Sequence, residues 1–207
     1  MRQRWALCIV ALTAGVSMIV GVMIGNASAD DAAPALSGVD VGFAQDMLAH
    51  HQQAITIVGQ LSPQAAPEVR AVADQISGTQ LAETGQMRGW LQAAGEPEQS
   101  PTPMAWMGSE HAQHSDHTGS AMMPGMADDA ELTALHETTG VANEIRFLQL
   151  MIRHHQGGIS MAQYVRQHGH NSSVTATATQ MQDEQSNEVD LMVTLLTARG
   201  GAPLPFA

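Results

Sequence analysis

The stretch Phe43-Ala-Gln-Asp-Met-Leu-Ala-His-His-Gln52 decides the fold, because the chain repeats it. The second copy is Phe147-Leu-Gln-Leu-Met-Ile-Arg-His-His-Gln156, which lies 104 positions later (147 − 43). A repeat that keeps Phe, Gln, Met and two adjacent His in register indicates two related structural units. Because imidazole and thioether groups bind metal ions, the doubled Met-x-x-His-His is also a candidate metal site.

Helical periodicity surrounds the repeat. Apolar residues recur at spacings of three and four over positions 43–61, which predicts a helix with His50 on its buried face and His51 at the margin. A second helix is predicted over positions 68–91, because its apolar residues have the same spacing and Gly95 follows as a stop signal. Its inward face returns 105 positions later (185 − 80). The repeated inward residues are Gln80, Glu83 and Met87, and then Gln185, Glu188 and Met192.

Each half is therefore a helical hairpin, and two hairpins predict an all-α four-helix bundle. We expect hairpin 1 at 39–95, hairpin 2 at 129–200, and a Met/His-rich central loop at 96–128 between them. These parts belong to one domain, 39–207, which follows a linker at 30–38.

The inward glutamates Glu83 and Glu188 need partners, because an unpaired carboxylate in an apolar core costs several kcal/mol. The doubled histidines on the neighbouring helices can hydrogen-bond to them or share a metal ion with them. A His-Glu core network without metal explains the same pattern. Ordinary core filling, the commoner role of methionine, is the alternative for the methionines of the bundle, which are Met47, Met87, Met151 and Met192.

The central stretch carries a second concentration of metal-binding residues. They are Met104, Met107, His111, His114, His117, Met122, Met123 and Met126. Several Pro and Gly interrupt the stretch and it has no amphipathic period, so it predicts a flexible loop in which core filling cannot explain the methionines. Thioether with imidazole, in the absence of thiolate, suits Cu(I). A disordered linker with incidental His and Met is the alternative.

Residues 1–29 are typical of an export signal, with Arg2 and Arg4 before an uncharged run and Ala27-Ser-Ala29 at its end. Cleavage after Ala29 is favoured. An uncleaved segment would instead anchor the chain in a membrane through residues 5–25. Either outcome places the domain outside the cytoplasm, in the periplasm or cell envelope, or secretes it.

Composition excludes several classes of function. After residue 29 the chain has no cysteine, so neither a disulfide nor a thiolate site is available. Six arginines face 20 acidic residues, a net charge of −14 (6 − 20), which argues against nucleic acid as a partner. No nucleophile motif, phosphate-binding loop or dinucleotide fingerprint occurs, so no organic cofactor is expected.

The two His-His stretches, together with Met122-Met-Pro-Gly-Met126, closely resemble the bacterial family called domain of unknown function 305 over about residues 40–197. The resemblance implies a ferritin-like four-helix bundle, exported or membrane-tethered, in a family with some periplasmic copper-binding members. This chain has Ala49 and Arg153 where the family often has Pro, and Asp46 is matched by Leu150. The family's Met, His and Glu positions fall here on Met47, His50, His51, Glu83, Met87, Met151, His154, His155, Glu188 and Met192.

Three functions compete. The first is an exported copper protein that buffers Cu(I) or carries it to another copper-handling protein of the envelope, without catalysis. The second is a metal-free structural or interaction module of the envelope. The third is a ferritin-like redox metalloenzyme, against which neither His pair has a Glu three residues before it, as a di-iron bundle requires.

Overall fold

The computed structural model describes residues 35–108 and 123–206, which are all-α, with no strand in either range. The predicted signal, the linker up to residue 34, and four of the candidate site residues lie outside the described residues. These four are His111, His114, His117 and Met122.

Four long helices form the bundle, and their bounds are α2 (Gly38–Gly59), α3 (Pro67–Ala94), α5 (Gly140–His168) and α6 (Ser172–Ala198). Local signals set their ends: Ser37 and Asp40 form a capping box at the start of α2, and Gly95 ends α3 in the left-handed conformation. A short helix, α4 (Asp129–His136), and a 3-10 turn, η2 (Ala105–Met107), are additions that the repeat did not predict.

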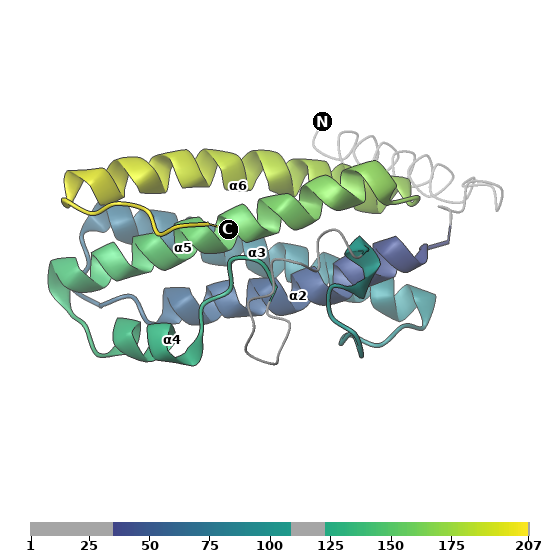
Figure 1. Ribbon diagram of the computed structural model, residues 1–207, viewed down its shortest axis with the longest axis horizontal. Helices are drawn as coiled ribbons and strands as arrows, with labels where there is room; N and C mark the ends of the chain where they lie inside the picture. Colours follow the sequence, from purple (N-terminus) through teal and green to yellow (C-terminus); the bar gives the residue numbers. More distant parts are fainter. Residues whose placement is uncertain (1–34, 109–122, 207) are drawn as a thin grey trace, which may run out of the picture. The chain divides into compact units, whose positions relative to one another are not determined.

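The four long helices run side by side along the bundle (Figure 1). Each contacts two neighbours: α2 packs on α3 and α5, while α6 packs on α5 and α3. The two hairpins are antiparallel, because Asp40 at the start of α2 accepts hydrogen bonds from the backbone N–H of His170 and Asn171, just after α5. At the other end, Asn143 near the start of α5 accepts a hydrogen bond from the N–H of Ser62, just after α2. The antiparallel arrangement brings the two His pairs to the same level.

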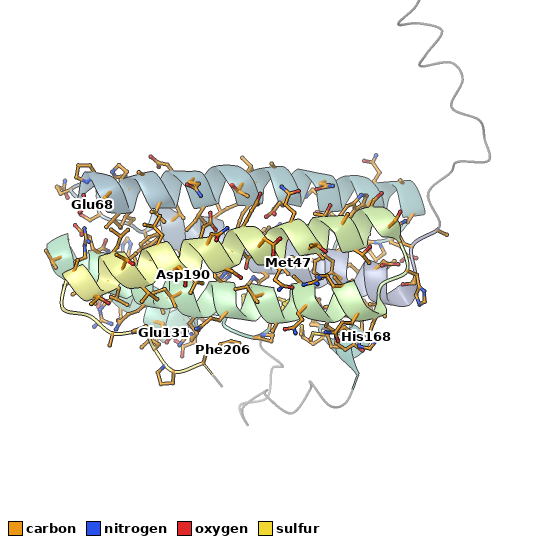
Figure 2. The ribbon with its side chains drawn as sticks, turned by 90° about the horizontal axis from the view of Figure 1, so that it is seen from above. Met47, Glu68, Glu131, His168, Asp190 and Phe206 are labelled. Carbon is orange, nitrogen blue, oxygen red and sulfur yellow. The ribbon has the colours of Figure 1, made fainter. Side chains whose placement is uncertain are left out.

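Along its length the core has three layers. One cluster, the isoleucine end, is built around Ile57, Ile76, Phe147, Met151 and Met192. The opposite cluster, the methionine end, is built around Phe43, Met47, Met87, Met104, Met107, Met161 and Met181. Between these two clusters lies a polar layer, to which each long helix contributes. Its residues are His50, His51, Gln80, Glu83, Thr84, His154, His155, Gln185 and Glu188. Figure 2 shows Glu68 and His168 toward opposite ends of the bundle, with Met47 toward the His168 end.

Helix α2 is buried on more than one face, because both described ends of the central segment pack on it. The side chain of Gln45 donates to the carbonyl of Pro97, and Asp46 Oδ2 accepts from the N–H of Met104 (2.6 Å) and from Trp106 Nε1 (2.7 Å). Gln53 makes a two-way hydrogen-bonded pair with the backbone of Ala127.

This packing corrects two predictions. His51 was expected at the margin of the buried stripe, but it is 0% exposed, because it packs inward against Glu83 of α3 and near His155 of α5 and Glu188 of α6. The sequence predicted that the methionines of the central stretch do not fill a core. Met104 and Met107, however, are buried in the methionine end. They reach the core where Asp46 of α2 accepts hydrogen bonds from the N–H of Met104 and from Trp106 Nε1. The local sequence pattern does not reveal this contact.

After α6 the chain turns back along the bundle toward its C-terminus (Figure 1), where Gln149 of α5 donates to the carbonyl of Ala202. Among the helices described, none combines the length and the apolar character needed to span a membrane.

Candidate metal centre

Two His-Glu pairs cross the polar layer, one in each hairpin. His51 Nε2 lies 2.8 Å from Glu83 Oε2, and His155 Nε2 lies 2.9 Å from Glu188 Oε2. Gln75 donates a further hydrogen bond to Glu188. The inward glutamates therefore have the histidine partners that the repeat predicts.

His50 and His154, the first histidines of the two His-His motifs, contact each other between α2 and α5, beneath the turn that contains Pro124. His50 Nε2 donates to the carbonyl of Pro124 (3.1 Å), and His154 Nε2 donates to the carbonyl of His50 (3.0 Å). A carbonyl can only accept, so Nε2 carries the proton in both rings and Nδ1 keeps its lone pair. Neither Nδ1 has a hydrogen-bond partner, and the two rings lie against each other in a tilted arrangement, with centroids 3.7 Å apart and planes inclined by 32°. Two buried nitrogen lone pairs are thus available for a soft metal ion.

Burial keeps these imidazoles neutral. It lowers the pKa of His50 to about 3, with the neighbouring His51 adding to the effect. It also lowers the pKa of His51 to about 3 and the pKa of His154 well below the ordinary 6.5. Burial, together with the nearby carboxylates of Glu184 and Glu188, raises the pKa of Glu83 to about 8. At neutral pH the histidines can therefore act as metal ligands without first losing a proton.

The turn after the central segment covers the stacked histidines. Gly125 has φ +76°, and its Cα approaches the backbone carbonyl of Arg153 so closely that a side chain there would collide. Gly157 leaves similar room for the carbonyl of Pro124. The Arg153 side chain donates to Glu131 of α4 and to the carbonyl of Met126. Arg153 therefore links the turn beside the histidines to α4 and α5.

Several other polar groups of the layer are buried without a hydrogen-bond partner. They include the side-chain amide of Gln80, the hydroxyl of Thr84 and Oε1 of Gln185. The sequence analysis did not identify Thr84 as part of this layer. Its position one helical turn after Gln80 is the signal that could have identified it. A buried polar group that lacks a partner usually marks a site for water, an ion or a ligand.

The predicted methionines fall into separate groups. Met47, Met87, Met104 and Met107 come together in the methionine end, with Met123 packed against it. Met151 and Met192 lie in the isoleucine end, and Met126 is partly exposed. Met161 and Met181 also lie in the methionine end and were missed, because neither matches a methionine in the other half of the repeat. Within residues 35–108 and 123–206, no three His, Cys, Asp or Glu side chains form a group that could hold a metal ion.

An open cavity of about 760 Å³ lies at the start of α2 beside Trp106. It is lined mainly by apolar and uncharged side chains, and His170 is its single histidine. No methionine lines it, so it is separate from the candidate metal ligands.

Comparison with known proteins agrees with this architecture. The family model for the domain of unknown function (DUF305) matches residues 40–196, and no curated protein matches the chain. The structure of a candidate secreted DUF305 protein from Streptomyces coelicolor is 36% identical and has a TM-score of 0.70, covering 81% of this chain and 96% of that one.

Two further solved structures share the fold. A DUF305 fragment from Deinococcus radiodurans is 30% identical with a TM-score of 0.66, covering 80% of this chain and 99% of that one. CopM in its Cu(II)-bound form is 25% identical with a TM-score of 0.61, covering 77% of this chain and 96% of that one. The match of the family model over most of the chain, together with these structures, means that the protein belongs to the DUF305 family.

Proposed function

We propose that this protein is a copper-binding protein that works outside the cytoplasm, where it buffers Cu(I) or passes it to another copper-handling protein. Binding and release are sufficient for this role, and no bond is made or broken in a substrate. The donors are neutral imidazole and thioether groups, which suit a soft monovalent ion.

The observation that carries the proposal is the pair of stacked rings of His50 and His154. Both rings are fully buried, both have Nε2 committed to a carbonyl, and both keep an unpartnered Nδ1. Met47, one turn before His50 on α2, brings a thioether to the same region. The donor set therefore combines nitrogen and sulfur in a site from which water is largely excluded.

The relatives support the same proposal. CopM is a Cu(II)-bound protein of the same fold, and the Streptomyces coelicolor relative is a candidate secreted protein. The export signal predicted at residues 1–29 is consistent with that location.

A competition titration tests the proposal. The protein is titrated with Cu(I) in the presence of a chromogenic chelator, and Zn(II) is titrated in parallel. Tight binding that is selective for copper is the expected result. No binding, or equal uptake of zinc, contradicts the proposal.

One observation favours a second candidate, a metal-free structural module of the envelope. In the His51–Glu83 and His155–Glu188 pairs, each histidine is hydrogen-bonded to its glutamate. Such a core network is complete without a metal ion. If this candidate is correct, thermal stability does not respond to Cu(I). A shift of the unfolding midpoint on addition of stoichiometric Cu(I) rules it out.

A further inference from the structure

The methionines are distributed unequally between the two ends of the core. Of the 14 buried residues in the methionine end, six are Met, whereas two of the 17 in the isoleucine end are Met. Each long helix contributes one of them, namely Met47 from α2, Met87 from α3, Met161 from α5 and Met181 from α6. The remaining two, Met104 and Met107, come from the central segment.

The internal repeat allows the two ends to be compared position by position. Met161 corresponds to Ile57 (161 − 104), and Met181 corresponds to Ile76 (181 − 105). Both isoleucines are fully buried in the opposite end, so an apolar branched side chain fills these positions well. Core filling alone therefore gives no reason for sulfur at Met161 and Met181.

The central segment packs on the same end. Asp46 holds the backbone of Met104 and the ring of Trp106 against α2, and Met123 packs against the methionine end where the segment returns. Asp46 is itself buried and directly precedes Met47 in α2.

We propose that Met161 and Met181 are Cu(I) ligands, which complete a thioether site with Met47 and Met87 so that each long helix supplies one sulfur donor. This inference rests on the proposed copper-binding function and names thioether donors of the bundle in addition to the imidazoles of His50 and His154. Met104, Met107 and Met123 cover the site from the central segment. Met151 and Met192, at the isoleucine end, are not part of it.

A matched pair of double variants tests the inference. Met161→Leu with Met181→Leu removes two sulfurs from the methionine end, and Met151→Leu with Met192→Leu makes the same chemical change at the isoleucine end. Cu(I) affinity is measured by competition with the chromogenic chelator, and the sulfur ligands are counted by X-ray absorption at the copper edge. Circular dichroism checks the fold, and Met161→Ile with Met181→Ile, which copies the residues at the equivalent positions, is the second variant of the methionine end.

The Met161/Met181 variants are expected to lose about 100-fold or more in Cu(I) affinity, because changes in supporting residues outside the ligand set already cost about 10–100-fold. Their copper should show fewer sulfur neighbours, whereas the Met151/Met192 variant keeps both properties of the wild type. Equal affinity in the wild type and both methionine-end variants overturns this inference and leaves the proposed function standing. A wild-type protein that does not bind Cu(I) overturns both.

Discussion

Each of the three central histidines whose pKa is lowered resists protonation in the folded state, so acid should destabilise the protein. His50, His51 and His154 have pKa values below the ordinary 6.5 because burial disfavours their charged forms. Their contribution to stability is complete above 6.5 and is lost as the pH falls toward their folded-state values. Each proton taken up only by the unfolded chain costs about 1.4 kcal/mol per pH unit.

Glu83 acts in the opposite direction. Its pKa is raised from 4.5 to about 8, so its contribution is complete below 4.5 and is lost as the pH rises toward 8. Between pH 6.5 and 4.5, acid lowers the free energy of unfolding through three histidines and raises it through one glutamate. The net effect of acid is therefore destabilising. The free energy of unfolding in urea should fall from pH 7 to pH 5. A curve that is flat or rises toward pH 5 would contradict this, and the exposed His136→Gln control should leave the slope unchanged.

Replacing Glu188 with Ala should lower the free energy of unfolding of the metal-free protein by about 1–3 kcal/mol, because His155 and Gln75 then lose their acceptor. Urea unfolding at pH 7 measures the change. Glu98→Ala is the control: Glu98 pairs with Arg88 at the surface, where an ion pair contributes about 0–1 kcal/mol. Equal effects of the two changes would mean that Glu188 faces solvent.

At the scale of elements, the anchoring of the central segment on α2 depends on Asp46. The substitution Asp46→Leu introduces the residue found at the equivalent position 150. It should leave the backbone N–H of Met104 and the indole N–H of Trp106 without an acceptor. Hydrogen exchange at the Met104 amide should then speed up roughly 10-fold or more, as expected when a local opening becomes easier by about 1–3 kcal/mol.

Helicity should stay near that of the wild type, since the four long helices do not depend on this contact. Asp46→Asn keeps one acceptor oxygen and should preserve much of the protection at Met104. Unchanged exchange in Asp46→Leu would show that other contacts hold the segment.

The long helices could be predicted because their signals are local. Apolar spacing marks α2 and α3, and the duplication marks α5 and α6 independently. The 3-10 turn η2 could not be predicted, because it forms where Asp46, 58 residues away, accepts from the N–H of Met104. The position of α4 likewise depends on Arg153, which pairs with Glu131 across 22 residues.

The candidate site was predicted in part for the same reason. The repeat identified the doubled histidines as partners of Glu83 and Glu188, since the histidines recur after 104 positions and the glutamates after 105. Met161 and Met181 were not predicted as site residues, because the repeat has no methionine at the equivalent positions. Only the antiparallel packing of the hairpins brings them into one cluster with Met47 and Met87. The sequence marks what the halves share, whereas the packing shows where they differ.

At the scale of the whole molecule, Cu(I) should raise the midpoint of thermal unfolding, because the proposed donors come from four helices and meet only in the folded bundle. With free Cu(I) at 100 times its Kd, the stabilisation should be about 2.7 kcal/mol. Differential scanning calorimetry under anaerobic reducing conditions measures the shift, with Zn(II) as the comparison. An unchanged midpoint with Cu(I) would argue against any site built across the bundle.

The burial of the methionine end also affects how the protein withstands oxidants. Conversion of methionine to its sulfoxide makes the side chain polar, which disrupts an apolar core and removes a soft donor. Six sulfurs enclosed at this end are at most 9% exposed, so peroxide in the surrounding medium meets the partly exposed Met123 and Met126 first. A domain without cysteine after residue 29 can thus keep reduced sulfur in its interior in a compartment where free thiols would be oxidised.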